Sequence, residues 1–106
     1  MPAWLVVRAV VADPADRADF DRWYGEEHLP DALRDFRAEA AWRGWSRSDA
    51  SVHYAHYRFP GVAAAEAVTS GAAIQALVAE FDRSWGRRVT RTREIIEVAD
   101  VLEAKP

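Results

Sequence analysis

The chain has 106 residues, the size of one domain, and a two-layer fold of this size has little volume for an enclosed pocket. Its net charge of −3 argues against attraction to nucleic acid or to an anionic membrane, and no apolar run is long enough to span a bilayer. It has no cysteine, which excludes disulfides and thiolate chemistry and favours a reducing compartment. We therefore expect a cytoplasmic protein that binds neither nucleic acid nor membrane.

The first third of the chain predicts a strand followed by an interrupted helix. Residues 3–12, AWLVVRAVVA, are apolar at odd and even positions, which is typical of a central strand and not of a signal peptide. Asp13 followed by Pro14 predicts a helix start with Asp13 as the N-cap. Because proline lacks an N–H group and clashes with the preceding turn, Pro30 predicts a break or kink near residues 27–29. A short helical turn is expected after it.

The remainder predicts two strands, a helix and a last strand, at residues 38–47, 51–59, 62–85 and 88–98. The order of elements is then βαββαβ, the ferredoxin-like pattern of the α+β class. That pattern has a four-stranded antiparallel sheet with two helices on one face, here as a single domain over residues 1–106. In it the first and third strands are central.

The strand at residues 3–12 is apolar on both faces, yet helices would cover only one face of the sheet. A second copy of the chain is the simplest cover for the other face, so we expect a homodimer packed sheet to sheet. The alternative is a monomer with a mildly apolar open face.

The segment at residues 20–33, FDRWYGEEHLPDAL, resembles a signature of small dimeric α+β barrel proteins, in which a Trp-Tyr pair precedes a His-x-Pro. The likeness is greatest to EthD-like members. The resemblance implies a ferredoxin-like dimer with a barrel between its sheets and a small-molecule cleft between sheet and helices. Such proteins include cofactor-free monooxygenases, lactone isomerases, polyketide cyclases and haem-dependent enzymes, so no single reaction is implied. Where relatives have a Gly-aromatic pair, this chain departs from the pattern with residues 35–37, Asp-Phe-Arg.

His28 is the candidate catalytic residue. On a helix it shares a face with Tyr24 and Phe20, four and eight residues earlier, and that face points at the sheet. Imidazole exchanges protons near neutral pH, so His28 is the natural general acid or base. Glu26 and Glu27 are adjacent but do not face it on a regular helix. The alternative is a structural histidine that bonds a carbonyl freed by the proline.

The strand at residues 51–59 has two polar faces. One carries Tyr54, His56 and Arg58, and the other carries His53, Ala55, Tyr57 and Phe59. Such polar groups need partners on a covered strand, so one face lines a ligand-filled cleft or forms a network across the dimer interface. The sequence does not say which face is which. His53 and His56 lie on opposite faces, so they cannot share a zinc ion.

Tryptophan and arginine supply further candidates. Trp42 could stack on a flat aromatic ligand, although core and dimer contacts are the alternative for the five tryptophans. Arg87, Arg91 and Arg93 share a strand face and could bind a carboxylate or phosphate. We favour a structural role for these arginines, in ion pairs with the first helix or in protecting an edge strand.

The sequence therefore predicts a cofactor-independent enzyme that does acid/base chemistry on a small apolar or aromatic carbonyl metabolite, with no bound metal. His28 would move the proton, and the candidate substrate contacts are Trp23, Tyr24, Trp42, Tyr54, His56 and Arg58. The alternatives are a non-catalytic binding or assembly module, and a haem protein with His28 as the axial ligand.

Overall fold

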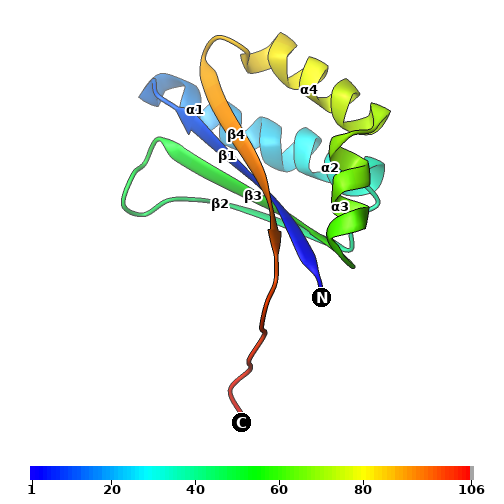
Figure 1. Cartoon of the computed structure of the whole chain (residues 1–106). Coiled ribbons are helices and arrows are strands. Elements are labelled where there is room, and N and C mark those ends of the chain that lie inside the picture. Colours follow the sequence, from blue (N-terminus) through cyan, green and yellow to red (C-terminus); the bar gives the residue numbers. More distant parts are fainter. Residues whose placement is uncertain (106) are drawn as a thin grey trace.

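The computed structural model describes residues 1–105. Its elements are, in chain order, β1 (Ala3–Val11), the 3₁₀ turn η1 (Pro14–Asp16), α1 (Arg17–Trp23), the π turn η2 (Tyr24–His28), α2 (Leu29–Asp35), β2 (Ala40–Trp45), β3 (Val52–Phe59), α3 (Val62–Thr69), α4 (Ala72–Trp85) and β4 (Val89–Glu97). The strands form one antiparallel sheet in the order β2-β3-β1-β4, with β3 and β1 in the centre. The predicted ferredoxin-like α+β fold is confirmed (Figure 1).

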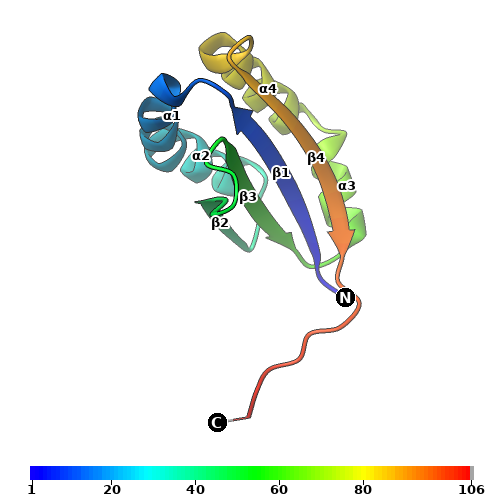
Figure 2. The same ribbon diagram turned by 90° about the vertical axis from the view of Figure 1, so that its left-hand side faces the viewer.

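All helices lie on one face of the sheet, and the other face is open in the single chain (Figure 2). Along β1 the odd-numbered residues face the helices, and Ala3, Leu5 and Val11 are fully buried there. The even-numbered residues, Trp4 among them, face the open side, and pairing extends this alternation to the neighbouring strands. β1 is thus apolar on both faces although only one face lies in the core of the chain and the other is left uncovered.

The break or kink predicted before Pro30 takes the form of a change in helix type, because the α-helix gives way to a π turn that ends at His28 while the chain stays helical. Asp13 caps the start of this region, accepting a bond from the Ala15 N–H at 2.9 Å. The chain then stays helical from Arg17 to Asp35. In η2 the Leu29 N–H bonds the carbonyl of Tyr24, five residues earlier, which widens the helix by one residue. A π turn beside a proline accommodates the missing N–H and the bulk of the ring without ending the helix.

The atypical residues 35–37 form a helix C-cap. Arg37 has a φ of 53°, a left-handed conformation that usually belongs to glycine or asparagine after a helix. The Ala38 N–H reaches back to the carbonyl of Leu33 at 3.2 Å. This sharp turn buries Phe36 against Tyr57, with ring centroids 5.3 Å apart. Phe36, which belongs to the three residues that depart from the pattern of the similar proteins, is thus packed into the core next to β3.

The second helical region divides into α3 and α4 at Ser70–Gly71, with a bend of 54°. α4 packs Ile74, Leu77, Phe81 and Trp85 into the core, at the spacings of three and four that place residues on one face of a helix. No single helix within residues 1–105 is long and apolar enough to cross a membrane; the bent α3–α4 pair passes that test of length and composition only together. Beyond β4 the chain extends away from the domain (Figure 1).

A candidate small-molecule site between the sheet and the helices

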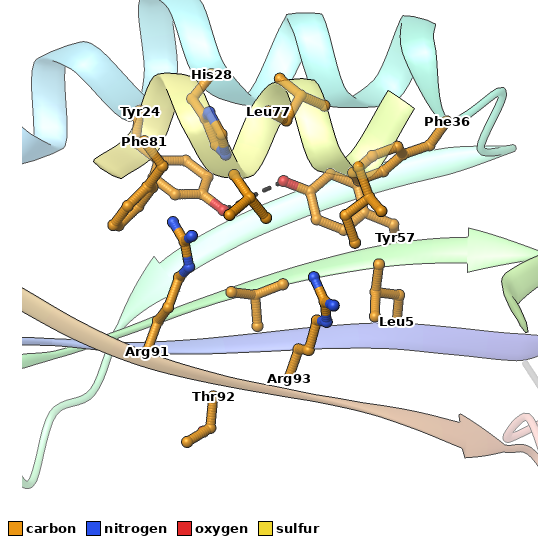
Figure 3. Close-up of a pocket in the computed structure, with 13 residues that line it drawn as sticks. Leu5, Tyr24, His28, Phe36, Tyr57, Leu77, Phe81, Arg91, Thr92 and Arg93 are labelled. Atoms are coloured by element: carbon orange, nitrogen blue, oxygen red, sulfur yellow. Dashed lines mark hydrogen bonds between the residues drawn. The ribbon is translucent and has the colours of Figure 1, made fainter. Parts of the chain in front are cut away.

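A cavity of about 290 Å³ lies between the sheet and the helical layer. Its apolar lining includes Leu5, Val7, Phe36, Ile74, Leu77, Val78 and Phe81. Its polar lining comes from the π turn, from β3 and from β4: Tyr24, His28, Tyr57, Arg91, Thr92 and Arg93 (Figure 3). An apolar cavity with a few polar groups gathered in it is the usual form of a small-molecule site.

His28 points from the π turn toward a pair of tyrosines in this cavity (Figure 3). Its ring stacks on Trp23 with centroids 4.7 Å apart and an interplanar angle of 23°, and it is only 9% exposed. The Nδ1 atom is buried and has no hydrogen-bond partner among the described residues. The proposed structural role, a bond to a carbonyl freed by Pro30, is therefore not made by Nδ1. One nitrogen each of His53, His56 and Trp85 is buried without a partner in the same way.

Burial, the largest cause, and the positive charge of Arg91 together lower the pKa of His28 to about 4, while Asp31 opposes both effects. The imidazole is thus neutral at physiological pH and keeps a lone pair for a proton or a hydrogen bond. The site contains a histidine that is held in its basic form by its surroundings.

Tyr24 and Tyr57 face each other in the cavity, and their hydroxyl oxygens are 3.2 Å apart. Both side chains are buried, at 1% exposure each. Burial raises the pKa of Tyr24 to about 12 and that of Tyr57 well above its usual value. Two neutral phenols have two hydroxyl hydrogens, and their mutual bond uses one of them. The second hydrogen is available to an oxygen atom of a ligand.

Two arginines of β4 line the opposite wall, and Figure 3 shows their guanidinium groups pointing from the strand toward the helices. Arg91 lies over the ring of Phe81 at 3.8 Å and bonds Asp82 at 3.3 Å. Arg93 forms no ion pair or side-chain hydrogen bond with any of residues 1–105. Both side chains occupy the helix-facing side because β4 pairs with β1 in a register that places Arg91 beside Ala9 and Arg93 beside Val7.

A polar network behind the cavity supports the π turn. The Asp21 carboxylate accepts bonds from Trp45 Nε1 and from Arg43, each at 2.8 Å. These two bonds lower the pKa of Asp21, Trp45 having the larger effect. Arg43 also lies 3.3 Å from Nε2 of the fully buried His53. A Cβ atom on Gly25 would come within 2.8 Å of the Arg43 guanidinium, so this glycine leaves room for the network.

The predicted substrate contacts separate into two groups. Tyr24 lines the cavity, and Trp23 packs behind His28 without lining it. Trp42, Tyr54, His56 and Arg58 lie on the open face of the sheet, so the structure does not bring them together with His28. There His56 stacks on Trp42 at 3.7 Å and Arg58 pairs with Glu39 at 3.4 Å. The His53 face of β3 is the one that faces the helices.

The sequence reasoning omitted Tyr57, Arg91 and Arg93 from the site. Tyr57 was on the β3 face left undecided, and the arginines were assigned a structural role. One signal could have found them: once β1 and β3 are central, Tyr57, Arg91 and Arg93 share the face that carries the fully apolar odd positions of β1.

The cavity does not fit the haem group that the resemblance allowed. Its volume of about 290 Å³ lies at the lower end of the range for small-molecule sites, about 300–1,000 Å³. The His28 ring is also packed between Trp23 and Phe81, at centroid distances of 4.7 and 5.7 Å. A flat macrocycle over that ring would need these side chains to move.

No family model and no curated protein matches the sequence. Solved structures do match. An EthD-family protein from Bacillus halodurans is similar with a TM-score of 0.71 at 14% identity, over 92% of this chain and 99% of that one. SnoaB, a cofactor-independent oxygenase from Streptomyces nogalater, in its N63A mutant form, has a TM-score of 0.71 at 12% identity, over 97% and 98%. HapK from Hahella chejuensis has a TM-score of 0.68 at 14% identity, over 97% of this chain and 99% of that one. At such identities the likeness shows the shared fold, as the resemblance implied.

Proposed function

We propose that the cavity is the active site of an enzyme that moves a proton next to a carbonyl group of a small, mostly apolar metabolite. The observation that carries the proposal is the neutral His28 imidazole, directed at the Tyr24–Tyr57 pair inside an apolar cavity. The similarity in fold to a cofactor-independent oxygenase is consistent with an enzyme that carries its own acid/base groups.

His28 is the proton acceptor in this proposal. With a pKa of about 4 it is ready to accept a proton over the whole physiological pH range, but it is a weak base. It can therefore remove a proton only from a carbon whose anion the site stabilises strongly. A C–H bond next to a carbonyl meets this requirement when the developing enolate oxygen has hydrogen-bond donors.

The Tyr24–Tyr57 pair supplies that donor. Because burial raises both pKa values, the phenols stay protonated and donate hydrogen bonds rather than accept protons. The hydroxyl hydrogen left over from their mutual bond is directed by a second phenol behind it, and a chain of two such bonds strengthens the outer one. The enolate would then take the proton back at another carbon, or its nucleophilic carbon would attack an electrophilic carbon of the same molecule and close a ring, according to the substrate.

The test is proton exchange at carbon in heavy water, followed by proton NMR on 2-tetralone and phenylpyruvate as probes. We expect the protein to accelerate exchange of the hydrogens next to the carbonyl, and His28→Gln to lower the rate by about 10²-fold or more. His56→Gln, a histidine that stacks on a tryptophan outside the cavity, is the matched control and should exchange as the unmodified protein does. The proposal fails if His28→Gln exchanges at the original rate or if neither ketone is exchanged faster than in buffer.

We also propose that a second copy covers the open face of the sheet. That face carries Trp4, Val6 and Trp42, and Ile96 at its other edge, with Trp42 48% and Ile96 44% exposed in the single chain. An apolar patch that crosses a whole sheet marks an interaction surface. Sheet-to-sheet packing of two copies would bury it in a closed, symmetric pair.

A further inference from the structure

We infer that the substrate carries a carboxylate, and that Arg91 and Arg93 of β4 bind it on the cavity wall opposite the π turn. This inference rests on the proposed function only for where the reacting carbon lies. The anion subsite itself depends on four separate observations, namely the charge balance of the cavity, the way each arginine is held, their common direction and the size of the space.

The charges that line the cavity do not balance. Arg91 and Arg93 are its only charged lining residues, since His28 is neutral and both tyrosines keep their protons. Asp82 pairs with Arg91 at 3.3 Å, and its own side chain is 60% exposed. One carboxylate against two guanidinium groups leaves one positive charge beside an apolar space. Arg93 is exposed in the single chain, so water solvates its guanidinium group, and a monoanionic ligand in the cavity could take the place of that water.

The two arginines are held differently, and together they form a receptor. Arg91 is fixed by the Phe81 ring beneath it at 3.8 Å and by Asp82, so its guanidinium is ordered before any ligand arrives. Arg93 has no ion-pair or hydrogen-bond partner within the part of the chain that the structure describes, so its donors remain available. Arginine presents a planar fork that matches the two oxygens of a carboxylate.

Their direction places the anion across from the proposed chemistry. Residues two apart on a strand point the same way about 7 Å apart, and both guanidinium groups in Figure 3 point toward the helical layer while Thr92 points away. His28 and the tyrosine hydroxyls approach from the other side of the space. A ligand with a carboxylate at one end and a carbonyl at the other could meet both walls.

The volume limits the rest of the ligand. A cavity of about 290 Å³ lined by Leu5, Phe36, Leu77 and Phe81 suits one ring or a short chain between the two polar ends. The structure therefore points to a small aromatic or alicyclic keto acid. A phosphate ester is the less fitting ligand, because a dianion would reverse the charge of the cavity instead of neutralising it.

Calorimetric titration with benzoate, benzamide and phenyl phosphate tests the subsite directly. We expect benzoate to bind at least tenfold more tightly than benzamide, which has the same shape without the charge, and more tightly than phenyl phosphate. Arg93→Gln should abolish the preference for benzoate over benzamide and leave benzamide binding unchanged. Arg83→Gln, which removes an exposed charge of α4, is the charge-matched control and should keep the preference.

The inference is overturned if benzoate does not bind, if benzamide or phenyl phosphate binds as well as benzoate, or if Arg93→Gln keeps the preference. His28→Gln separates it from the proposed function, because that variant should still prefer benzoate. If the protein prefers benzoate but does not accelerate proton exchange, the carboxylate site stands and the proposed enzyme activity fails. If the protein accelerates proton exchange on 2-tetralone but does not prefer benzoate, the proposed enzyme activity stands and the carboxylate site fails.

Discussion

The two faces of the sheet each carry a histidine stacked on a tryptophan, and the two pairs have different surroundings. On the covered face His28 lies on Trp23 at 4.7 Å, is only 9% exposed and lines a cavity. On the open face His56 lies on Trp42 at 3.7 Å, and that tryptophan is 48% exposed. The same two side-chain types are thus placed once beside polar groups that converge on a cavity and once among aromatic rings on the open face of the sheet.

The comparison shows that the polar groups around a histidine, more than the ring on which it stacks, determine whether it can take part in binding or catalysis. His28 has two phenols and two guanidinium groups around one space. Around His56 lie aromatic rings, with Trp4 at 6.1 Å and Tyr54 at 6.3 Å. The first arrangement can bind and polarise a molecule, whereas the second is suited to burial against another surface. Three predictions test this contrast.

The largest effect should come from the covered face. Phe20 is fully buried and its ring lies within 6.2 Å of Trp23, Tyr24 and Phe81, among others. Phe20→Ala should lower the free energy of unfolding by about 3–5 kcal/mol, because it removes a core side chain and leaves a cavity. Ile96→Ala on the open face should cost less than about 1 kcal/mol. Urea unfolding measures both, and equal losses would abolish the contrast in packing.

The second-largest effect should come from acid, which lowers the free energy of unfolding when the buried histidines of the covered face are protonated. Burial lowers the folded pKa of His28 and of His53 to about 4, against an ordinary value of 6.5. Between those values the unfolded chain binds more protons than the folded chain, so stability is full above about pH 6.5 and falls toward pH 4. Each of these two histidines should lower the free energy of unfolding by about 2 kcal/mol between pH 7 and pH 4.5. Most carboxyl groups titrate below this range.

Urea unfolding at several pH values measures this slope. His28→Gln and His53→Gln should each make it shallower, and His56→Gln should change it least, since His56 is only partly buried on the open face. A stability that does not vary between pH 7 and pH 4.5 would show that neither buried histidine has a lowered pKa.

The smallest effect concerns the open face and the association of two copies. Trp42→Ala should raise the dissociation constant of the dimer at least tenfold, about 1.4 kcal/mol, because a large aromatic ring at an interface is a typical anchor. Leu33→Ala, at another exposed apolar residue on α2, should leave the constant unchanged. Sedimentation equilibrium measures both. A protein that stays monomeric at high concentration would contradict the proposed dimer.

Sequence reasoning reached the fold because its main signals are periodic. Apolar residues at both parities of β1 and at spacings of three and four in α4 are direct consequences of burial. The same reasoning placed Phe20, Tyr24 and His28 on one inward face, and all three are buried. It located an irregularity before Pro30 but not its form, since the general cost of an internal proline does not reveal that a π turn can absorb it.

The site could be predicted only in part, because periodicity tells which residues share a face but not which face is covered. For β3 the predicted substrate contacts lie on the face of Tyr54, and the structure instead places Tyr57, from the opposite face, in the cavity. For β4 it grouped Arg91 and Arg93 correctly without showing what they face. The answer depends on the strand register with β1, which is a long-range property of the folded sheet.

The π turn at Tyr24–His28 holds one residue more than an α-helix would use over the same rise. Removing one residue of this turn would therefore let the segment close as a regular α-helix, with α1 and α2 in their present places. Ala32 and Phe36 would stay packed against the sheet. Only the side chains of the turn itself would be re-aimed, so a single-codon deletion here should disturb the chemistry of His28 and spare the packing of the next helix.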